Sequence, residues 1–395
     1  MEEFLEGNIP FKYLLNVKPP FRDMPSMKLV IMALRLIART ILKLKYEDGY
    51  EHYVELPNGT RRYFKDLVSH KEEILRDYRK MIQFNSLYSI LEMWFGDIEQ
   101  IPSKEIVLEI FGKILINSIT LVDEYGDHGG VIGKGLFLDA SVINHSCIPN
   151  AIYVYHGKEL IVKTIEEIEN FSDLRLCYIN NLISTEKRRK ILMEQYFFHC
   201  QCLKCEDIIS DLNNSSLICH KCQGCVPSVG GSCNNCGLAI ENSTIENFVK
   251  LKKKIQWALL LCRNNHSDDQ NNYESELLKD LFEEALHIFH PYDEDFFKLL
   301  DSSKLYEHYY FELGDYEKCL HILRLKLSNY KQNWPAYFPN IASHLIDMMF
   351  LCQELKYFSE AKGYLNRAED ILKVVYGDTE KECPLLIQCL NLHNK

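Results

Sequence analysis

The feature that most constrains the fold of this chain is the stretch of residues 135–150, GLFLDASVINHSCIPN. A short apolar strand is predicted over residues 136–138, and it leads into a tight polar turn that carries Asn144, His145 and Cys147. Pro149 fixes its own φ angle and biases the preceding residue toward extended geometry, so the turn is stiff. A stiff turn rich in hydrogen-bonding side chains indicates a site for a polar small molecule, although on composition alone a solvated hairpin loop is the commoner explanation.

Cysteine spacing is the second constraint. Ten of the fifteen cysteines lie between Cys147 and Cys236, and the N-terminus is acidic where a secretory signal would be basic. Clustered C-x-C and C-x-x-C spacings without an export signal predict metal binding rather than disulfides. Cys200, Cys202 and Cys205 place three thiols within six residues, so a tetrahedral zinc there needs a fourth ligand from elsewhere.

A second cysteine-rich stretch has the spacing of a zinc ribbon. Its two C-x-x-C pairs are Cys219 with Cys222 and Cys233 with Cys236, and the loop between them is rich in Gly and Ser. Cys225 lies between the pairs as either a spare thiol or an alternative ligand. The simpler alternative is a surface insertion that binds metal without a functional role.

Three motifs follow one another along the chain: NHSCIPN at residues 144–150, Cys177-Tyr178 at the end of a strand predicted over residues 174–178, and YFFHCQCLKC at residues 196–205. Together they resemble the SET methyltransferases, and in particular the SET-and-MYND (SMYD) family of lysine methyltransferases. The likeness covers most of the chain and is strongest over residues 117–205. It implies a protein-lysine N-methyltransferase that transfers a methyl group from S-adenosylmethionine to a lysine of a histone or another protein.

The resemblance also assigns roles to individual residues. It makes Cys147 the fourth ligand of the first zinc, and it makes Tyr178 the catalytic tyrosine that orients the lysine amine for in-line attack on the methyl carbon. Desolvation of that lysine in a narrow channel lowers its pKa and supplies the neutral nucleophile. Seven residues are expected to contact S-adenosylmethionine: Asn144, His145, Ser141, Asn117, Tyr196, Phe198 and His70. For Asn117 and His70 the simpler alternatives are a structural hydrogen bonder and an exposed helix histidine.

The expected fold class is α+β, with SET-type small β-sheets, inserted helices and a zinc-bound post-SET segment, followed by an all-α, tetratricopeptide-like C-terminal domain. The C-terminal assignment agrees with a sequence frame at Leu313 that recurs at Leu355, an offset of 42, although an ordinary helical bundle would look similar. The expected domains are residues 1–130 (helical N-terminal and inserted region), 131–184 (SET core), 185–240 (post-SET zinc region) and 241–395 (C-terminal helices).

Local patterns predict the individual elements. Residues 151–155 and 160–164 alternate around a turn and predict a β-hairpin. Ser103 is a plausible N-cap for the helix that follows it. Residues 1–24 are rich in proline and are expected to be irregular. Helices are predicted over residues 27–44, 66–85, 103–122 and 185–195, with another beginning at residue 86.

Composition limits the partners. A net charge of −11 argues against a general or sequence-specific nucleic-acid binder and suits a basic, lysine-rich peptide such as a histone tail. The apolar helix over residues 27–44 carries four cationic side chains, so it is not a bilayer span. The resemblance further implies a monomer in the cytoplasm and nucleus, with C-terminal helices that bind a chaperone or another protein.

The chain departs from the family pattern at two places. It has no cysteine before Cys147 and no Gly-rich strand loop before the first helix, so it is expected to begin past the first SET strands and the MYND zinc finger. Residues 171–174, FSDL, stand where the family has Gly-Glu-Glu-Leu. The alternatives to an active methyltransferase are therefore a catalytically impaired SET protein that serves as an interaction module, and a zinc-stapled structural protein without a cofactor.

Overall fold

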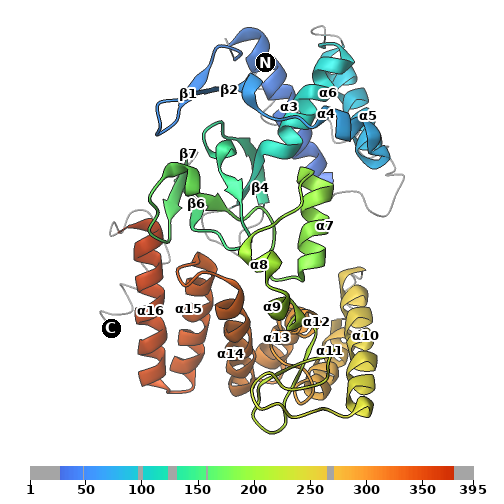
Figure 1. Cartoon of the computed structure of the whole chain (residues 1–395), viewed down its shortest axis with the longest axis vertical. Coiled ribbons are helices and arrows are strands. Elements are labelled where there is room, and N and C mark those ends of the chain that lie inside the picture. The colour runs from blue at the N-terminus through green and yellow to red at the C-terminus, as the bar shows by residue number, and fades with distance from the viewer. Residues whose placement is uncertain are drawn as a thin grey trace. The chain divides into compact units, whose positions relative to one another are not determined.

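The computed structural model describes residues 27–47, 49–96, 101–122, 131–156, 159–264 and 271–377 (Figure 1). The described residues form two compact units. The first unit contains the described parts of residues 1–123, 128–143 and 195–197, and the second contains the described remainder of the chain. The irregular segment expected at residues 1–24 lies outside the described residues.

Three helices form the core of the first unit: α3 (Met27–Tyr46), α5 (Tyr78–Phe95) and α6 (Lys104–Asn117). Leu34, Ile37 and Ile41 recur at helical spacing and line one buried face of α3, which confirms the helix expected there. Phe84 of α5 packs against Phe111 of α6 with ring centroids 5.5 Å apart. Among the described residues, none of the helices is long and apolar enough to cross a membrane.

The single helix expected over residues 66–85 is wrong. The chain instead forms a 3-10 turn, η1 (Phe64–Asp66), and a short helix, α4 (Lys71–Arg76), before α5 begins. Asp77 interrupts the helical path because its backbone is extended, with φ −90° and ψ 103°. Its carboxylate accepts a hydrogen bond from the backbone amide of Lys80, so Asp77 is the N-cap of α5. The helix expected to begin at residue 86 is the continuation of α5.

The helix expected over residues 103–122 ends earlier than predicted. Its last residue is Asn117, and the chain then becomes β3 (Ser118–Val122), which pairs antiparallel with β4 (Val131–Leu136). The residues SITLV include three β-branched side chains, which favour a strand once a partner strand is present. The strand expected over residues 136–138 lies too late in the chain, because β4 already ends at Leu136.

All five sheets among the described residues are two-stranded. The predicted hairpin is confirmed as β6 (Ala151–His156) and β7 (Glu159–Thr164). The strand expected over residues 174–178 is shorter, as β8 (Arg175–Leu176), and it pairs in parallel with β5 (Asn144–His145). The other two sheets pair β1 (Tyr53–Glu55) with β2 (Arg61–Tyr63) and β9 (Ser216–Ile218) with β10 (Cys225–Pro227). Small sheets among many helices agree with the coarse α+β prediction.

Helices make up most of the second unit, and they share one apolar core with the β6–β7 hairpin, which contributes Ile152 and Val154. The helix expected over residues 185–195 is confirmed as α7 (Thr185–Tyr196), whose last two residues belong to the first unit. The first unit also contains the 3-10 turn η3 (Ala140–Val142). The remaining turns and helices belong to the second unit: η4 (Phe171–Asp173), α8 (Leu203–Glu206), α9 (Ile208–Leu212), α10 (Asn242–Asn264), α11 (Asn271–Ala285), α12 (Glu294–Leu300), α13 (Ser303–Glu307), the π-helical turn η6 (His308–Glu312), α14 (Tyr316–Asn333), α15 (Pro339–Glu354) and α16 (Phe358–Tyr376).

The 42-residue offset in the sequence corresponds to two equivalent turns. Gly314 and Lys356 both adopt left-handed backbone angles, with φ of 63° and 62°. In each case a helix ends before the turn, and another begins two residues after it, at Tyr316 for α14 and at Phe358 for α16. Figure 1 shows α14, α15 and α16 side by side, as expected for successive antiparallel helices joined by such turns.

Candidate active site and metal centres

The NHSCIPN turn lies against the segment that leads to Tyr178. Besides the β5–β8 pairing, the backbone amide of Ser146 donates to the carbonyl of Leu176 at 2.9 Å. The side-chain amide of Asn150 donates to the carbonyl of Asp173 at 2.8 Å and accepts from the amide of Arg175 at 2.7 Å. The segment FSDL, which departs from the family pattern, therefore still forms a turn, η4, that is bonded to the NHSCIPN turn.

His145 joins the turn to Tyr178. The backbone amide of Tyr178 donates to Nδ1 of His145 at 3.0 Å, and the two rings lie 5.1 Å apart. Burial lowers the pKa of His145 to about 4, so the imidazole is neutral at pH 7. With Nδ1 as an acceptor, the proton lies on Nε2, which is 3.3 Å from the sulfur of Cys147 and donates to it. The ring of Phe198 lies 5.9 Å from the same imidazole.

Tyr178 is half-buried and lies two residues beyond the end of β8. Burial raises the pKa of its phenol to about 12, although the charge of Arg175 opposes this shift. The phenol is therefore protonated across the physiological range. Asn144, in contrast, is exposed on β5.

The first cysteine cluster consists of Cys147, Cys200, Cys202 and Cys205, whose sulfur atoms all lie within 4.8 Å of one another. Zinc–sulfur bonds of about 2.3 Å in a tetrahedron require sulfur atoms about 3.8 Å apart, and the sulfurs of Cys147 and Cys205 are 3.6 Å apart. Four thiols at separations close to this tetrahedral value are a donor set that fits zinc.

Arg188 of α7 is the cation beside the first cysteine cluster. Its side chain is 1% exposed, and Nη2 lies 3.5 Å from the sulfur of Cys205. Nη1 donates to the carbonyl of Ile183, and Nη2 donates to the hydroxyl of Thr185 at 2.7 Å. A buried guanidinium offsets the negative charge that four thiolates leave on a bound zinc ion. Arg188 cannot be singled out from the sequence, because a cation on a charged helix has no distinguishing local pattern.

The second cysteine cluster consists of Cys219, Cys222, Cys233 and Cys236, again with all sulfur atoms within 4.8 Å of one another. Each C-x-x-C pair is followed by a left-handed residue, Gln223 with φ 59° after the first and Gly237 with φ 71° after the second. In both knuckles this residue donates its backbone amide to the carbonyl of the first cysteine of the pair, at 2.8 and 2.9 Å. The donor set and its two matching knuckles fit zinc.

Cys225 is not part of the second cysteine cluster. It is buried on β10, and its thiol donates to the side-chain oxygen of Asn213 at 3.1 Å. The sequence leaves Cys225 as either a spare thiol or an alternative ligand, and the structure favours the spare thiol.

Four of the predicted cofactor residues belong to the first unit. Asn117 donates its side-chain amide to the carbonyls of Val68, at 2.9 Å, and Lys113, at 2.7 Å, so it fixes the segment before α4 to the end of α6. His70 is the N-cap of α4 in a left-handed conformation, and its ring lies 5.0 Å from that of Phe197. Phe197 is also left-handed, with φ 60°. Phe197 is not among the residues predicted from the sequence, although its neighbours Tyr196 and Phe198 are.

Ser141 and Tyr196 complete the predicted set in the first unit. The hydroxyl of Ser141 donates to the carbonyl of Leu138 at 2.7 Å and accepts from Nε of Arg62 at 3.1 Å. The phenol oxygen of Tyr196 accepts a hydrogen bond from the side chain of Gln195 at 3.2 Å. Asn144, His145, Tyr178 and Phe198 belong to the second unit, so the predicted set divides between the two units.

Comparison with known proteins finds relatives that are named lysine methyltransferases. No family model matches the chain. The chain is 31% identical over 177 residues to histone-lysine N-methyltransferase SMYD3 of Mus musculus, an alignment that covers 44% of this chain and 39% of SMYD3. It is 30% identical over 171 residues to N-lysine methyltransferase SMYD2 of Bos taurus, which covers 43% of this chain and 37% of SMYD2.

A longer alignment relates the chain to a plant protein. Histone-lysine N-methyltransferase ASHR1 of Arabidopsis thaliana is 26% identical over 367 residues, which cover 89% of this chain and 72% of ASHR1. The alignments with SMYD3 and SMYD2, in contrast, cover less than half the length of those two proteins. Its curated homologues are lysine methyltransferases of the SMYD family, which confirms the resemblance predicted from the sequence motifs.

Proposed function

We propose that this chain is a protein-lysine N-methyltransferase that transfers a methyl group from S-adenosylmethionine to a lysine of a histone or another protein. The homology to SMYD methyltransferases supports this proposal. The observation that carries it is the link between His145 and Tyr178, through a 3.0 Å hydrogen bond, because it joins the two motifs to which the family assigns the cofactor turn and the catalytic tyrosine.

The protonated phenol of Tyr178 defines the role proposed for this residue. A general base works best when its pKa lies near the operating pH, and the pKa of this phenol is raised to about 12. Tyr178 is therefore proposed to orient the lysine amine with its hydroxyl rather than to remove a proton from it. The neutral amine arises from desolvation of the substrate lysine.

Both cysteine clusters are proposed to hold zinc. Zinc bound by the first cysteine cluster supplies a structural clamp. Cys200, Cys202 and Cys205 would fix the segment that carries Phe198, and Cys147 would fix the turn that carries Asn144 and His145. Within the second unit, this arrangement keeps an aromatic ring beside the cofactor turn.

The proposal is tested on the full chain in three steps. Its zinc content is measured first, its binding of S-adenosylmethionine is then measured by calorimetric titration, and methyl transfer to a peptide array is assayed last. We expect binding, and we expect Tyr178→Phe to lower kcat by about a hundredfold or more while binding of S-adenosylmethionine persists. Tyr292→Phe, at a half-buried tyrosine of the helical region, is the matched control. A zinc-loaded, folded chain that binds no S-adenosylmethionine would refute the proposal.

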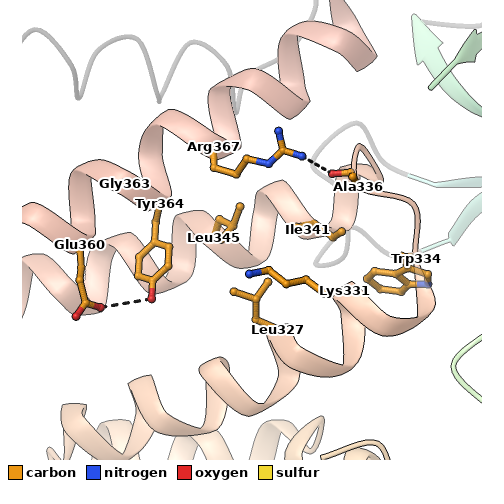
Figure 2. A pocket seen from close by; sticks show the side chains of 10 residues that line it. All are labelled: Leu327, Lys331, Trp334, Ala336, Ile341, Leu345, Glu360, Gly363, Tyr364 and Arg367. Carbon is orange, nitrogen blue, oxygen red and sulfur yellow. Dashed lines mark hydrogen bonds between the residues drawn. The ribbon is translucent and has the colours of Figure 1, made fainter. Parts of the chain in front are cut away.

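A second candidate is an interaction module built on the C-terminal helices. A cavity of about 640 Å³ lies between α14, α15 and α16 (Figure 2). Its walls combine apolar side chains, such as Leu327 and Leu345, with the cations Lys331 and Arg367. Its acid, Glu360, is paired with Arg324 at 2.7 Å. This lining suits an acidic, apolar segment of a protein partner, and the resemblance suggests a chaperone. Binding of such peptides by a Tyr178→Phe variant would separate this role from catalysis.

A further inference from the structure

Asn181 lies three residues after Tyr178, and both the nitrogen and the oxygen of its side-chain amide form a hydrogen bond. It is 3% exposed. Its Nδ2 donates to the carbonyl oxygen of Cys147 at 2.8 Å, and its Oδ1 accepts from the indole Nε1 of Trp334 at 2.6 Å. Because a side-chain amide offers a donor and an acceptor at opposite atoms, Asn181 bridges the NHSCIPN turn and the C-terminal end of α14.

Trp334 is a rigid anchor for this bridge. Its ring stacks on Tyr330, with centroids 4.3 Å apart and planes at 11°, and on Phe338, with centroids 4.9 Å apart. Its backbone amide donates to the carbonyl of Tyr330 at 2.8 Å, which ends α14. The same indole forms part of the wall of the cavity in Figure 2. Its position is therefore set by the C-terminal helices.

A second contact also joins the first cysteine cluster to the end of α14. Lys204, which lies between Cys202 and Cys205, donates its Nζ to the backbone carbonyl of Asn181 at 3.0 Å and to that of Asn333 at 3.2 Å. Asn333 is the last residue of α14, where the carbonyls lack helical partners and favour a cation. The segment 200–205 is thus bonded directly to the end of α14, and the Cys147 turn is linked to it through Asn181.

We propose that Asn181 is a positioning residue for methyl transfer, with Trp334 as its anchor. The pair holds the Cys147 carbonyl, and with it the cofactor turn and the segment after Tyr178, in register with α14. Without Asn181 the buried carbonyl of Cys147 would lose its donor, and the turn would shift to find another. The catalytic part of this inference rests on the proposed function, whereas the hydrogen-bonded link does not.

The link itself is tested by NMR of the three indole N–H groups in the zinc-loaded chain, which contains three tryptophans. Trp334→Phe and Trp257→Phe assign the signals. We expect slow solvent exchange at Trp334 and fast exchange at Trp257, whose side chain is 56% exposed on α10. Asn181→Asp keeps the acceptor for Trp334 and should preserve slow exchange, whereas Asn181→Leu should abolish it. Exchange at Trp334 as fast as at Trp257 would overturn the inference.

The positioning role is tested by kinetics on the same variants. Asn181→Asp and Trp334→Phe, which keeps the aromatic stack but lacks the N–H donor, should each raise KM for S-adenosylmethionine about three- to tenfold. The double variant should be no worse than the more impaired single variant, because each breaks the same bridge. Trp257→Phe should be unchanged. Additive effects, or unchanged KM alongside a lowered melting temperature, would overturn the positioning role. A wild-type chain without any binding of S-adenosylmethionine would refute the proposed function, while the NMR result would still decide whether the link exists.

Discussion

The two cysteine clusters each bring four sulfur atoms close together, but their ligands come from different distances along the chain. The first cluster brings together Cys147 and Cys205, which are 58 positions apart, and it lies against the buried cation Arg188. The second takes all its ligands from a stretch in which Cys219 and Cys236 are 17 positions apart, and there the amide of Asn235 donates to the sulfur of Cys233. The first site therefore depends on the tertiary fold, whereas the second depends on two local turns.

The two clusters are also hydrogen-bonded to different parts of the fold. The first cluster is bonded through Cys147 and Lys204 to Asn181 and the end of α14. The second belongs to a ribbon whose strand β9 is fixed to the loop before α12: the amide of His290 donates to the carbonyl of Ser216 at 3.1 Å. Loss of metal from the first cluster should therefore disturb the proposed active site, and loss from the second should disturb the packing of the helical region.

The largest effect is expected from exchanging one ligand of each cluster. Cys147→Ser should lower the zinc affinity of the first cluster at least about a hundredfold and abolish methyl transfer, because a hydroxyl replaces a thiolate that also belongs to the cofactor turn. Cys233→Ser should release the other zinc and lower the melting temperature while binding of S-adenosylmethionine persists. Zinc stoichiometry and calorimetry distinguish the two. Equal loss of cofactor binding in both variants would contradict the comparison.

The next effect concerns the charge beside the first cluster. Arg188→Gln should lower the zinc affinity of that cluster about 10- to 100-fold, because the amide can still donate hydrogen bonds but no longer offsets the thiolate charge. The measurement is competition with a chromophoric chelator. Lys190→Gln, an exposed cation on the same helix, is the matched control and should have no effect. An equal zinc loss in both variants would show that the charge of Arg188 is not specific to the site.

Acid should lower the free energy of unfolding through His290, which is bonded to the strand β9 beside the second cysteine cluster. Burial lowers the pKa of His290 to about 4, below its ordinary value of 6.5. Because the folded pKa is the lower one, this histidine contributes stability above pH 6.5 that is lost as the pH falls toward 4. The loss amounts to about 3 kcal/mol. His290→Gln should flatten the pH dependence of the free energy of unfolding, measured by urea denaturation between these pH values. An unchanged slope would rule this assignment out.

The smallest effect is expected at Cys225. Cys225→Ser should leave the zinc stoichiometry unchanged, because this thiol lies outside the second cysteine cluster and bonds to Asn213. The free energy of unfolding should fall by about 1 kcal/mol or less, since a hydroxyl can replace the thiol as the donor. Loss of one zinc from this variant would mean that Cys225 is a ligand after all.

Much of the local structure could be predicted from the sequence. The apolar residues of α3 recur at the spacing at which its side chains are buried, and the β6–β7 hairpin pairs over the residues whose alternation predicts it. The failures lie where a local pattern allowed two outcomes. The charged run before residue 86 predicts one helix, but Asp77 caps a second one there. The apolar run SITLV predicts helix, but its pairing with β4 makes it a strand. Periodicity alone does not distinguish these cases.

The short-range ligand spacing can be read from the C-x-C-x-x-C segment and the two C-x-x-C knuckles, because a few residues set how close neighbouring thiols can come. Which distant groups meet these thiols depends on the tertiary fold: the sulfur of Cys147, the guanidinium of Arg188, and Trp334 through Asn181. Such partners are chosen by the packing of segments far apart in the chain, and no local pattern records which buried donor will face which buried acceptor.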